Sequence, residues 1–238
     1  MERKSSLNKI AETFIKQGGV FRISPESLAE KFTQIRGVVL DWDGVFHSGY
    51  KGEGYSGLFS EADSMGLNML RYGHWRRKSE LLHVSIVSGE NNPTAVKFAE
   101  REHLTVCTKI SDKKGAIDHL CRMENLKPSQ IVCVFDDIND LSMAQVCGLR
   151  VQVKRQGSPL FVQYTDDHSL CDYVTAHSAR DNAVREICEL FLGLSGSYEH
   201  VVKSRMDFDK EYQQYLQARN SNKVNCYTSK NGIITLVD

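Results

Sequence analysis

Short apolar runs alternate with amphipathic stretches along most of the chain from Gly37 onward. The apolar runs are near-continuous and rich in β-branched residues, which is typical of strands buried on both faces of a sheet. They lie at Val38–Leu40, Val84–Val87, Thr105–Cys107, Ile131–Phe135 and Leu149–Val153. Between them, apolar residues at helical spacing predict helices over Pro93–His103, Lys113–Asn125 and Ile138–Cys147. Strand and helix in repetition predict an α/β fold, a Rossmann-like parallel sheet with helices on both faces.

Two segments flank this alternating core. Residues 1–35 are expected to form one or two helices, the second beginning near Ser24 and Pro25. Residues 195–238 are expected to form a charged helix, about Tyr198 to Arg219, and then a short strand-like end. We therefore predict an N-terminal helical extension (1–35), a core domain (36–194) and a C-terminal helix and tail (195–238). A solvated helix packed on the core is the simplest interpretation of each extension, and an oligomer contact or a substrate lid is the alternative.

The segment between the first strand and the first core helix, residues 44–62, holds five glycines interleaved with aromatic residues. This pattern predicts a β-hairpin flap, and the segment is too short for a separate cap domain.

Composition limits the classes of partner. The 30 Lys and Arg residues balance the 30 Asp and Glu residues, so no global basic field attracts nucleic acid or a membrane surface. No apolar run approaches the length of a membrane span, and the polar N-terminus has no apolar segment typical of a signal peptide. The 7 cysteines form no C-x-x-C pair and fall in apolar runs, which predicts buried, reduced thiols and a cytoplasmic protein.

Two carboxylates directly follow the first predicted strand, at Asp41 and Asp43, before Gly44. Residues i and i+2 of an extended chain point to the same side, so both are expected to face one site at the carboxyl end of the sheet, where ligands bind in open α/β sheets. Adjacent carboxylates raise each other's pKa, and a divalent cation relieves that repulsion. By itself, the motif is a weak signal of function, because a turn or a helix cap would also explain it.

Polar residues also follow later strands. Ser88 and Gly89 come after the second strand, where a hydroxyl can donate to a phosphoryl oxygen or simply cap the next helix. Lys113 and Lys114 begin a predicted helix. A lysine in a first helical turn opposes the helix dipole, so an anion to bind would explain it, although a solvated lysine is the commoner explanation.

The densest acidic cluster, Asp136, Asp137 and Asp140, follows the fourth strand. Acidic residues are good helix caps, but three carboxylates this close together require a cation. Hard oxygen ligands of this kind suit Mg²⁺. The sequence therefore predicts a magnesium site where the strand ends meet.

These motifs stand in the order Asp-x-Asp, Ser, Lys and Asp-Asp-x-x-Asp, and as a set they resemble the four motifs of the haloacid dehalogenase (HAD) superfamily of phosphatases. The resemblance covers about Gly37 to Leu194 and implies a Mg²⁺-dependent phosphatase acting on a small phosphorylated metabolite. It also implies that Asp41 is the nucleophile, forming an aspartyl-phosphate, and that Asp43 is the general acid and base.

The same resemblance implies roles for the other motif residues. The phosphoryl-binding residues would be Ser88, Gly89 and Lys114. The metal ligands would be the carboxylates of Asp41 and Asp136 and the backbone carbonyl of Asp43, with Asp137 and Asp140 binding or orienting the metal's waters.

Within the superfamily, the chain resembles the cap-less acid-sugar phosphatases of 3-deoxy-manno-octulosonate (KDO) 8-phosphate and of KDN and sialic acid 9-phosphates. The similar segments are the Gly-rich flap, Phe59–Leu67, Asp172–Thr175 and Ala183–Glu186. The resemblance implies a keto-deoxy sugar acid phosphate as substrate and a homotetramer in which a neighbour's flap helps to close the site. The residues closer to the nine-carbon branch, and therefore the candidates for substrate specificity, are Asp63, Ser64 and Glu90.

The chain also departs from that family. Phe135 stands where a glycine usually precedes the paired aspartates, and its side chain is expected to crowd the turn. Residues 178–182 replace a Gly-rich run, and both extensions lie outside the usual boundaries. These departures favour, as the alternative to an enzyme, a catalytically weak HAD-fold binding or assembly module. Phosphotransfer, as in a mutase, is a third possibility, but a short flap argues against it because transfer requires that water be excluded.

Overall fold

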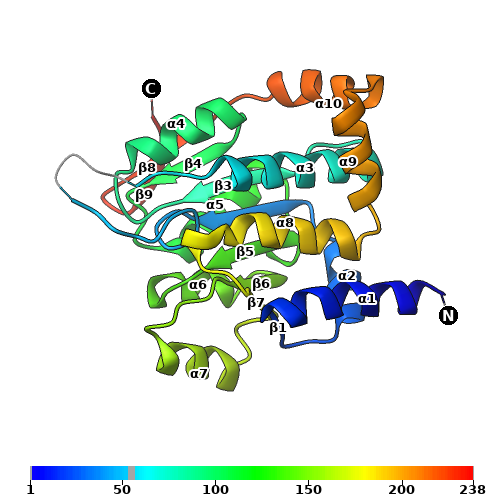
Figure 1. Ribbon diagram of the computed structural model, residues 1–238. Coiled ribbons are helices and arrows are strands. Elements are labelled where there is room, and N and C mark those ends of the chain that lie inside the picture. Colours follow the sequence, from blue (N-terminus) through cyan, green and yellow to red (C-terminus); the bar gives the residue numbers. More distant parts are fainter. Residues whose placement is uncertain (1, 53–56, 238) are drawn as a thin grey trace.

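A nine-stranded sheet forms the centre of the computed structural model, which describes residues 2–52 and 57–237 (Figure 1). The strand order is β1-β7-β6-β5-β2-β3-β4-β8-β9. Strands β2 to β8 run parallel, and β1 and β9 pair antiparallel at the two edges. The strands are β1 (Val20–Phe21), β2 (Gly37–Asp41), β3 (His83–Val87), β4 (Thr105–Thr108), β5 (Ile131–Phe135), β6 (Leu149–Gln152), β7 (Tyr173–Val174), β8 (Cys226–Lys230) and β9 (Ile233–Leu236).

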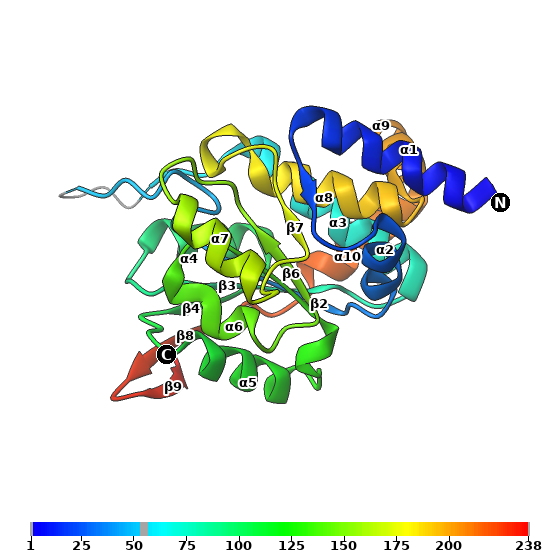
Figure 2. The same ribbon diagram turned by 90° about the horizontal axis from the view of Figure 1, so that it is seen from below.

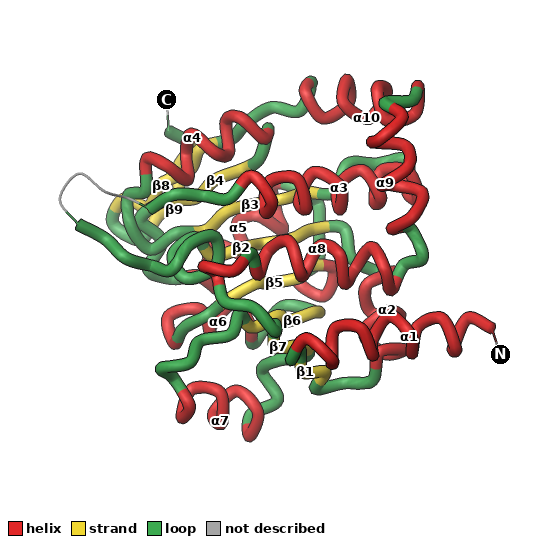
Figure 3. Tube along the Cα trace, in the orientation of Figure 1, coloured by secondary structure: helices red, strands yellow, loops and turns green. Residues whose placement is uncertain are grey.

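Helices cover both faces of this sheet (Figures 2 and 3). They are α1 (Glu2–Gln17), α2 (Pro25–Thr33), α3 (Glu61–Lys78), α4 (Pro93–Glu102), α5 (Lys113–Met123), α6 (Leu141–Ala144), α7 (Pro159–Asp167), α8 (Ala183–Leu194), α9 (Tyr198–Asp207) and α10 (Lys210–Asn220), with 3₁₀ turns at Pro128–Gln130, Ile138–Asp140 and Ala179–Asp181. Alternate strand residues enter two cores: Val38 and Leu40 pack with α3 and α8, whereas Val39 packs with α5. The predicted α/β fold with a parallel sheet is therefore confirmed.

The segment from residue 44 to 60 leads from β2 to α3. The hairpin pairing predicted for the flap involves residues 53–56, which lie outside the described residues, so that pairing stays a prediction. The apolar end of the flap anchors it, because Phe59 packs on Phe98 of α4.

The C-terminal segment is part of the core, and the sequence pattern did not predict this in full. The single helix expected over about Tyr198 to Arg219 is wrong, since the chain turns at Phe208, which has a φ of 47°. The Asp209 side chain accepts a hydrogen bond from the Tyr212 backbone N–H and so starts α10 as a separate helix. Strand β8, which was not predicted, then adds to the sheet beside β4.

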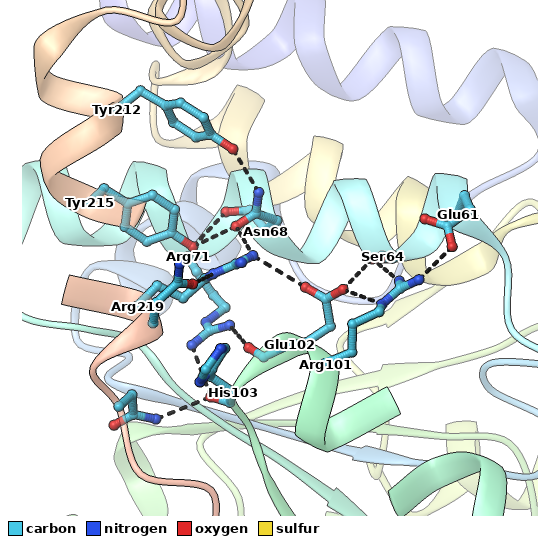
Figure 4. Close-up of polar contacts among 12 residues, drawn as sticks. Glu61, Ser64, Asn68, Arg71, Arg101, Glu102, His103, Tyr212, Tyr215 and Arg219 are labelled. Carbon is cyan, nitrogen blue, oxygen red and sulfur yellow. Dashed lines mark hydrogen bonds and ion pairs between the residues drawn. The ribbon is translucent and has the colours of Figure 1, made fainter. Parts of the chain in front are cut away.

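Polar contacts fix α10 on α3 (Figure 4). The buried Tyr215 hydroxyl donates to Asn68, 2.8 Å from Oδ1, and Nδ2 of Asn68 donates to the Tyr212 hydroxyl at 2.9 Å. Arg71, which is also on α3 and is buried, donates to the backbone carbonyls of Glu102 and His103 at the end of α4. The C-terminal helix thus buries one face on the core, as a packed extension should.

Most of the cysteines and Phe135 lie in the interior of the protein. The cysteines are free, and all are buried except Cys226, which is partly exposed. Phe135 does not crowd the turn before the aspartates, so that expectation is wrong: its side chain is fully buried and lies edge-on to Phe161 in the core on the α5 side of the sheet. In the described part of the chain, no helix has both the length and the apolar character that a membrane crossing needs.

Candidate active site

Three strand ends bring the predicted motifs together at one edge of the sheet. Strand β2 lies between β3 and β5 and runs parallel to both, so Asp41, Ser88 and Asp136 meet at neighbouring carboxyl ends. Carboxylate oxygens of Asp41, Asp136 and Asp140 all lie within 4.8 Å of one another. All three side chains are buried, so their charges are not dispersed into solvent.

A buried lysine lies between two of these carboxylates, and it is Lys113. Its Nζ is 2.5 Å from Oδ1 of Asp41 and also donates to Asp140. The carboxylates raise the pKa of Lys113 in spite of burial, which by itself would lower it. The prediction that Lys114 reaches the site is wrong, because Lys114 is exposed on the next position around α5. Successive helical residues point about 100° apart, so two adjacent lysines cannot share a face.

The acidic cluster carries more negative charge than the lysine balances. Burial, followed by the charge of Asp140, raises the pKa of Asp41 to about 7 although Lys113 opposes the shift. Burial and the charge of Asp41 raise the pKa of Asp136 to about 8. Asp136 accepts no hydrogen bond within the described residues, although Nη1 of Arg155 lies 2.8 Å from its Oδ2. Buried, under-compensated carboxylates that face one another fit a divalent cation with oxygen ligands.

Close approach of the backbone shapes this edge of the cluster. Gly44 has a φ of +89°, and a Cβ added to it would lie 2.0 Å from Oδ2 of Asp136. Any other residue there would displace the carboxylate, so the glycine of the Asp-x-Asp-Gly motif is required by contact as well as by conformation.

Asp43 points to a different set of groups, all of them donors. Its carboxylate lies 3.1 Å from Nε2 of His47, 2.8 Å from Nζ of Lys51 and 2.9 Å from Nδ2 of Asn92. Burial would raise the pKa of Asp43, but the hydrogen bonds from His47, Lys51 and Asn92 together lower it to about 2. The Asp43 side chain is therefore separate from the three clustered carboxylates and is ionised in this arrangement.

Asn92 also connects the second motif to the first. The Ser88 side chain is fully buried, and its Oγ accepts from Nδ2 of Asn92 at 2.5 Å and from the Glu90 backbone N–H at 3.3 Å. Asn92 occupies the N-cap position of α4, but its side chain makes no capping hydrogen bond. It is instead turned toward Ser88 and Asp43. Gly89 and Glu90 lie beside Ser88 in the same loop and are exposed.

Asp137 and Asp140 have different surroundings. Asp140 is fully buried and joins the carboxylate cluster, where its Oδ2 also accepts from the backbone N–H groups of Asp136 and Asp137. Asp137 is half-exposed and pairs with Arg155 at 2.8 Å. Asp140 is thus one of the three clustered carboxylates, whereas the resemblance implied that it acts only through the metal's waters, and Asp137 lies at the rim.

The structure does not bring Asp63 and Ser64 into this cluster. The buried Asp63 carboxylate accepts from the Arg185 backbone N–H at 2.8 Å and so holds the first turn of α8. Ser64 donates to Glu102 at 2.9 Å and accepts from Arg101 at 2.7 Å (Figure 4). Within this chain both residues join helices to one another, and of the predicted specificity residues Glu90 alone lies next to the site.

Sequence reasoning missed four polar residues that surround the motifs. They are His47, Lys51, Asn92 and Arg155. Asn92 had a recognisable signal, since an asparagine before a proline at a helix start is a capping residue that can be diverted to a site. The other three sit in loops, whose paths the sequence pattern does not give.

Comparison with solved structures identifies the fold. The KDO 8-phosphate phosphatase from Yersinia pestis is 27% identical, with a TM-score of 0.59, and the match covers 72% of this chain and 88% of that one. A protein from Legionella pneumophila, described as a HAD superfamily (subfamily III A) hydrolase, is 25% identical, with a TM-score of 0.62. That match covers 76% of this chain and 94% of the other. The KDO 8-phosphate phosphatase from Moraxella catarrhalis, solved with magnesium, phosphate and KDO, is 23% identical, with a TM-score of 0.62, covering 75% and 98%.

Neither models of known protein families nor the curated proteins give a match to this chain. The structural homologues are HAD hydrolases and phosphatases, and the chain resembles the KDO 8-phosphate phosphatases among them in fold. About a quarter of the chain lies outside each of these matches.

Proposed function

We infer that this chain, which belongs to the HAD superfamily, is a Mg²⁺-dependent phosphomonoesterase that acts through an aspartyl-phosphate on Asp41. The observation that carries the proposal is the cluster of buried carboxylates from Asp41, Asp136 and Asp140, within 4.8 Å of one another and joined by Lys113. Such a cluster is costly to a fold unless a cation balances its charge. The structural homologues include a HAD hydrolase and a phosphatase, which supports phosphate ester hydrolysis as the reaction.

Asp41 is the proposed nucleophile. A carboxylate oxygen of Asp41 attacks the phosphorus, an acyl-phosphate bond forms, and the bond from phosphorus to the ester oxygen breaks. Lys113 lies 2.5 Å from Asp41 and can neutralise charge on the phosphoryl oxygens during transfer. Ser88 and Gly89 follow β3, the strand beside β2, and are the proposed hydrogen-bonding partners of the phosphoryl group.

Asp43 is the proposed general acid and base. Its carboxylate, kept ionised by the surrounding donors, suits the second half of the reaction, in which water attacks the acyl-phosphate and gives its proton to Asp43. The first half needs a proton on Asp43 for the leaving oxygen. Lys51 lies in the flap segment and is partly exposed, so substrate that displaces its ammonium group removes one donor and raises the pKa of Asp43.

The residues that would hold the cation are Asp41 and Asp136 through their carboxylates and Asp43 through its backbone carbonyl, with Asp140 next to them. When bound, Mg²⁺ supplies positive charge that polarises the phosphoryl group.

For the substrate, we propose a keto-deoxy sugar acid phosphate, either KDO 8-phosphate or a nonulosonate 9-phosphate. The support is the likeness to the Yersinia pestis phosphatase together with the motif similarities near the flap. A homotetramer and a cytoplasmic location belong to the same proposal. The alternative, a catalytically weak module, was motivated by Phe135 and the two terminal extensions; of these, Phe135 packs away from the carboxylates.

The test is phosphate release from p-nitrophenyl phosphate and from a panel of phosphorylated sugars and sugar acids, with and without Mg²⁺. We expect hydrolysis that requires Mg²⁺, falls to background in Asp41→Asn, and persists in the control Arg122→Gln, which changes an exposed residue of α5. Undiminished hydrolysis after chelation of the metal, or by Asp41→Asn, would contradict the mechanism. If sugar acid phosphates are no better than generic esters, the substrate class is wrong while the reaction class stands.

A further inference from the structure

A hollow of about 470 Å³ opens beside the carboxylate cluster. Its wall includes Gly44 and Ser48 from the segment after β2, Lys154 and Arg155 from the loop after β6, and Arg180 with Asp181 from the turn before α8. This volume lies in the range of small-ligand sites and is far larger than a single phosphate group needs.

The hollow and the carboxylate cluster share part of their wall. Gly44 borders the hollow and also touches the Asp136 carboxylate. Arg155 borders the hollow too, with Nη1 2.8 Å from Oδ2 of Asp136 and 2.8 Å from Oδ2 of Asp137. A substrate whose phosphate lies at Asp41 can therefore extend its body into this hollow.

The lining of the hollow is positively charged. It carries Lys154, Arg155 and Arg180 against the single carboxylate of Asp181, which accepts a hydrogen bond from Ser178. Among the described residues, neither Lys154 nor Arg180 has an ion-pair partner, and both are exposed. Lys154 and Arg180 are therefore uncompensated cations, and they lie with Arg155 around one concave surface. Such a surface attracts an anionic group.

The backbone that carries these cations is fixed. The Lys154 backbone N–H donates to the buried Thr175 hydroxyl at 2.9 Å, and that hydroxyl donates to the His177 carbonyl. Arg180 lies in a 3₁₀ turn beside the buried Ala179. The positions from which the two side chains extend are thus set by the core, which is what a binding site needs if it is to discriminate.

We propose that Lys154, Arg155 and Arg180 form a subsite for a second anionic group of the substrate, at the end remote from the phosphate that is cleaved. This inference rests on the proposed phosphatase function and extends it by assigning residues to the recognition of a carboxylate or a second phosphate. Arg155 pairs with Asp136 and Asp137, and its guanidinium group is the one that can contact both parts of the ligand.

Steady-state kinetics of Lys154→Gln, Arg180→Gln and the double variant test the subsite. The probes are KDO 8-phosphate, which has a carboxylate, fructose 1,6-bisphosphate, which has a second phosphate, and p-nitrophenyl phosphate, which has no second anion. We expect each single variant to raise the KM of the preferred two-anion substrate about 10-fold and the double variant about 100-fold, with kcat little changed. The KM for p-nitrophenyl phosphate should stay within about twofold.

Two controls separate charge at this place from general effects. Arg122→Gln removes an exposed cation at the far end of α5 and should leave every KM unchanged. Lys154→Arg keeps the charge and should behave like the parent protein. If the KM of KDO 8-phosphate rises in the variants, the recognised group is a carboxylate; if the KM of fructose 1,6-bisphosphate rises, it is a phosphate.

The failure of this inference differs from the failure of the proposed function. If p-nitrophenyl phosphate is hydrolysed normally but the double variant leaves the KM of both two-anion probes unchanged, the subsite is refuted and the phosphatase stands. If no phosphomonoester is hydrolysed by the parent protein with Mg²⁺, both proposals fail together.

Discussion

Replacing Lys113 by methionine gives the sharpest test of how the carboxylate cluster is balanced. The ammonium group lies between Asp41 and Asp140 and is 1% exposed. Methionine keeps an unbranched side chain of similar length and removes the charge, so two buried carboxylates lose their shared partner. The matched control is Lys114→Met, because Lys114 is the exposed neighbour on the same helix.

The expected loss of stability follows from the burial of the pair. Removing one partner of a buried ion pair costs about 3–5 kcal/mol. The pKa of Asp41 is already about 7, so near neutral pH an uncompensated Asp41 can take up a proton at little cost. We therefore expect the lower end of the range, about 3 kcal/mol, which for a domain of this size lowers Tm by about 6–12 °C. Lys114→Met should change Tm by less than about 2 °C.

Two measurements check the reasoning. Differential scanning fluorimetry, with and without saturating Mg²⁺, should show a larger Mg²⁺-induced rise of Tm in Lys113→Met than in the parent, because the cation then replaces the missing positive charge. Phosphate release should fall about 10²–10³-fold in Lys113→Met, as expected when one charge that stabilises the transition state is lost. The reasoning is refuted if Lys114→Met loses as much activity or stability as Lys113→Met.

Three further predictions concern groups around the core and the site. Asn92→Asp puts a carboxylate against Asp43 in place of a donor 2.9 Å away and should lower kcat/KM about 10–100-fold, measured by phosphate release; equal activity in the variant would argue against the contact. Burial, followed by the charge of a nearby arginine, lowers the pKa of His74 to about 4, so the unfolded chain binds the proton first as pH falls below about 6.5. The free energy of unfolding, measured by urea titration, should therefore decrease by up to about 3 kcal/mol between about pH 6.5 and pH 4. The decrease should be smaller in His74→Gln. Tyr215→Phe removes the two hydrogen bonds that the Tyr215 hydroxyl donates to Asn68, while those of Tyr212 and Arg219 remain, and should lower Tm by about 2–4 °C with unchanged kcat/KM; an unchanged Tm would mean that the Tyr215 contact does not hold α10.

Several residues of the site could be predicted from the sequence because they stand at the ends of predicted strands. Asp41 and Asp136 could be assigned because each comes directly after a buried, β-branched run, and parallel neighbouring strands put such positions at one edge. The choice between Lys113 and Lys114 could also have been made from helical phase. Lys113 stands three and four residues before the buried Ala116 and Ile117, so it shares their inward face.

Other parts had no usable signal in the sequence pattern. Strand β8 is short and polar in sequence, Cys226–Lys230, and becomes a strand because β4 offers it an open edge. The position of Arg155 against Asp136 depends on the path of the loop after β6. Phe135 was expected to crowd the turn because it stands where a glycine is usual, but its side chain enters the core on the α5 side of the sheet, since neighbouring residues of a strand point to opposite faces.

The sequence by itself determined the order along the chain of strands β2 to β6, and with it which carboxylates follow strand ends of the sheet. That information is local, since a buried strand and the residue after it are readable from a few neighbouring positions. Tertiary structure alone decided that Asn92 connects Ser88 to Asp43, that the C-terminal segment completes the sheet, and that Lys154 and Arg180 face one hollow. Those relations join residues far apart in the chain, and they are fixed by packing and loop paths that no short stretch of sequence encodes.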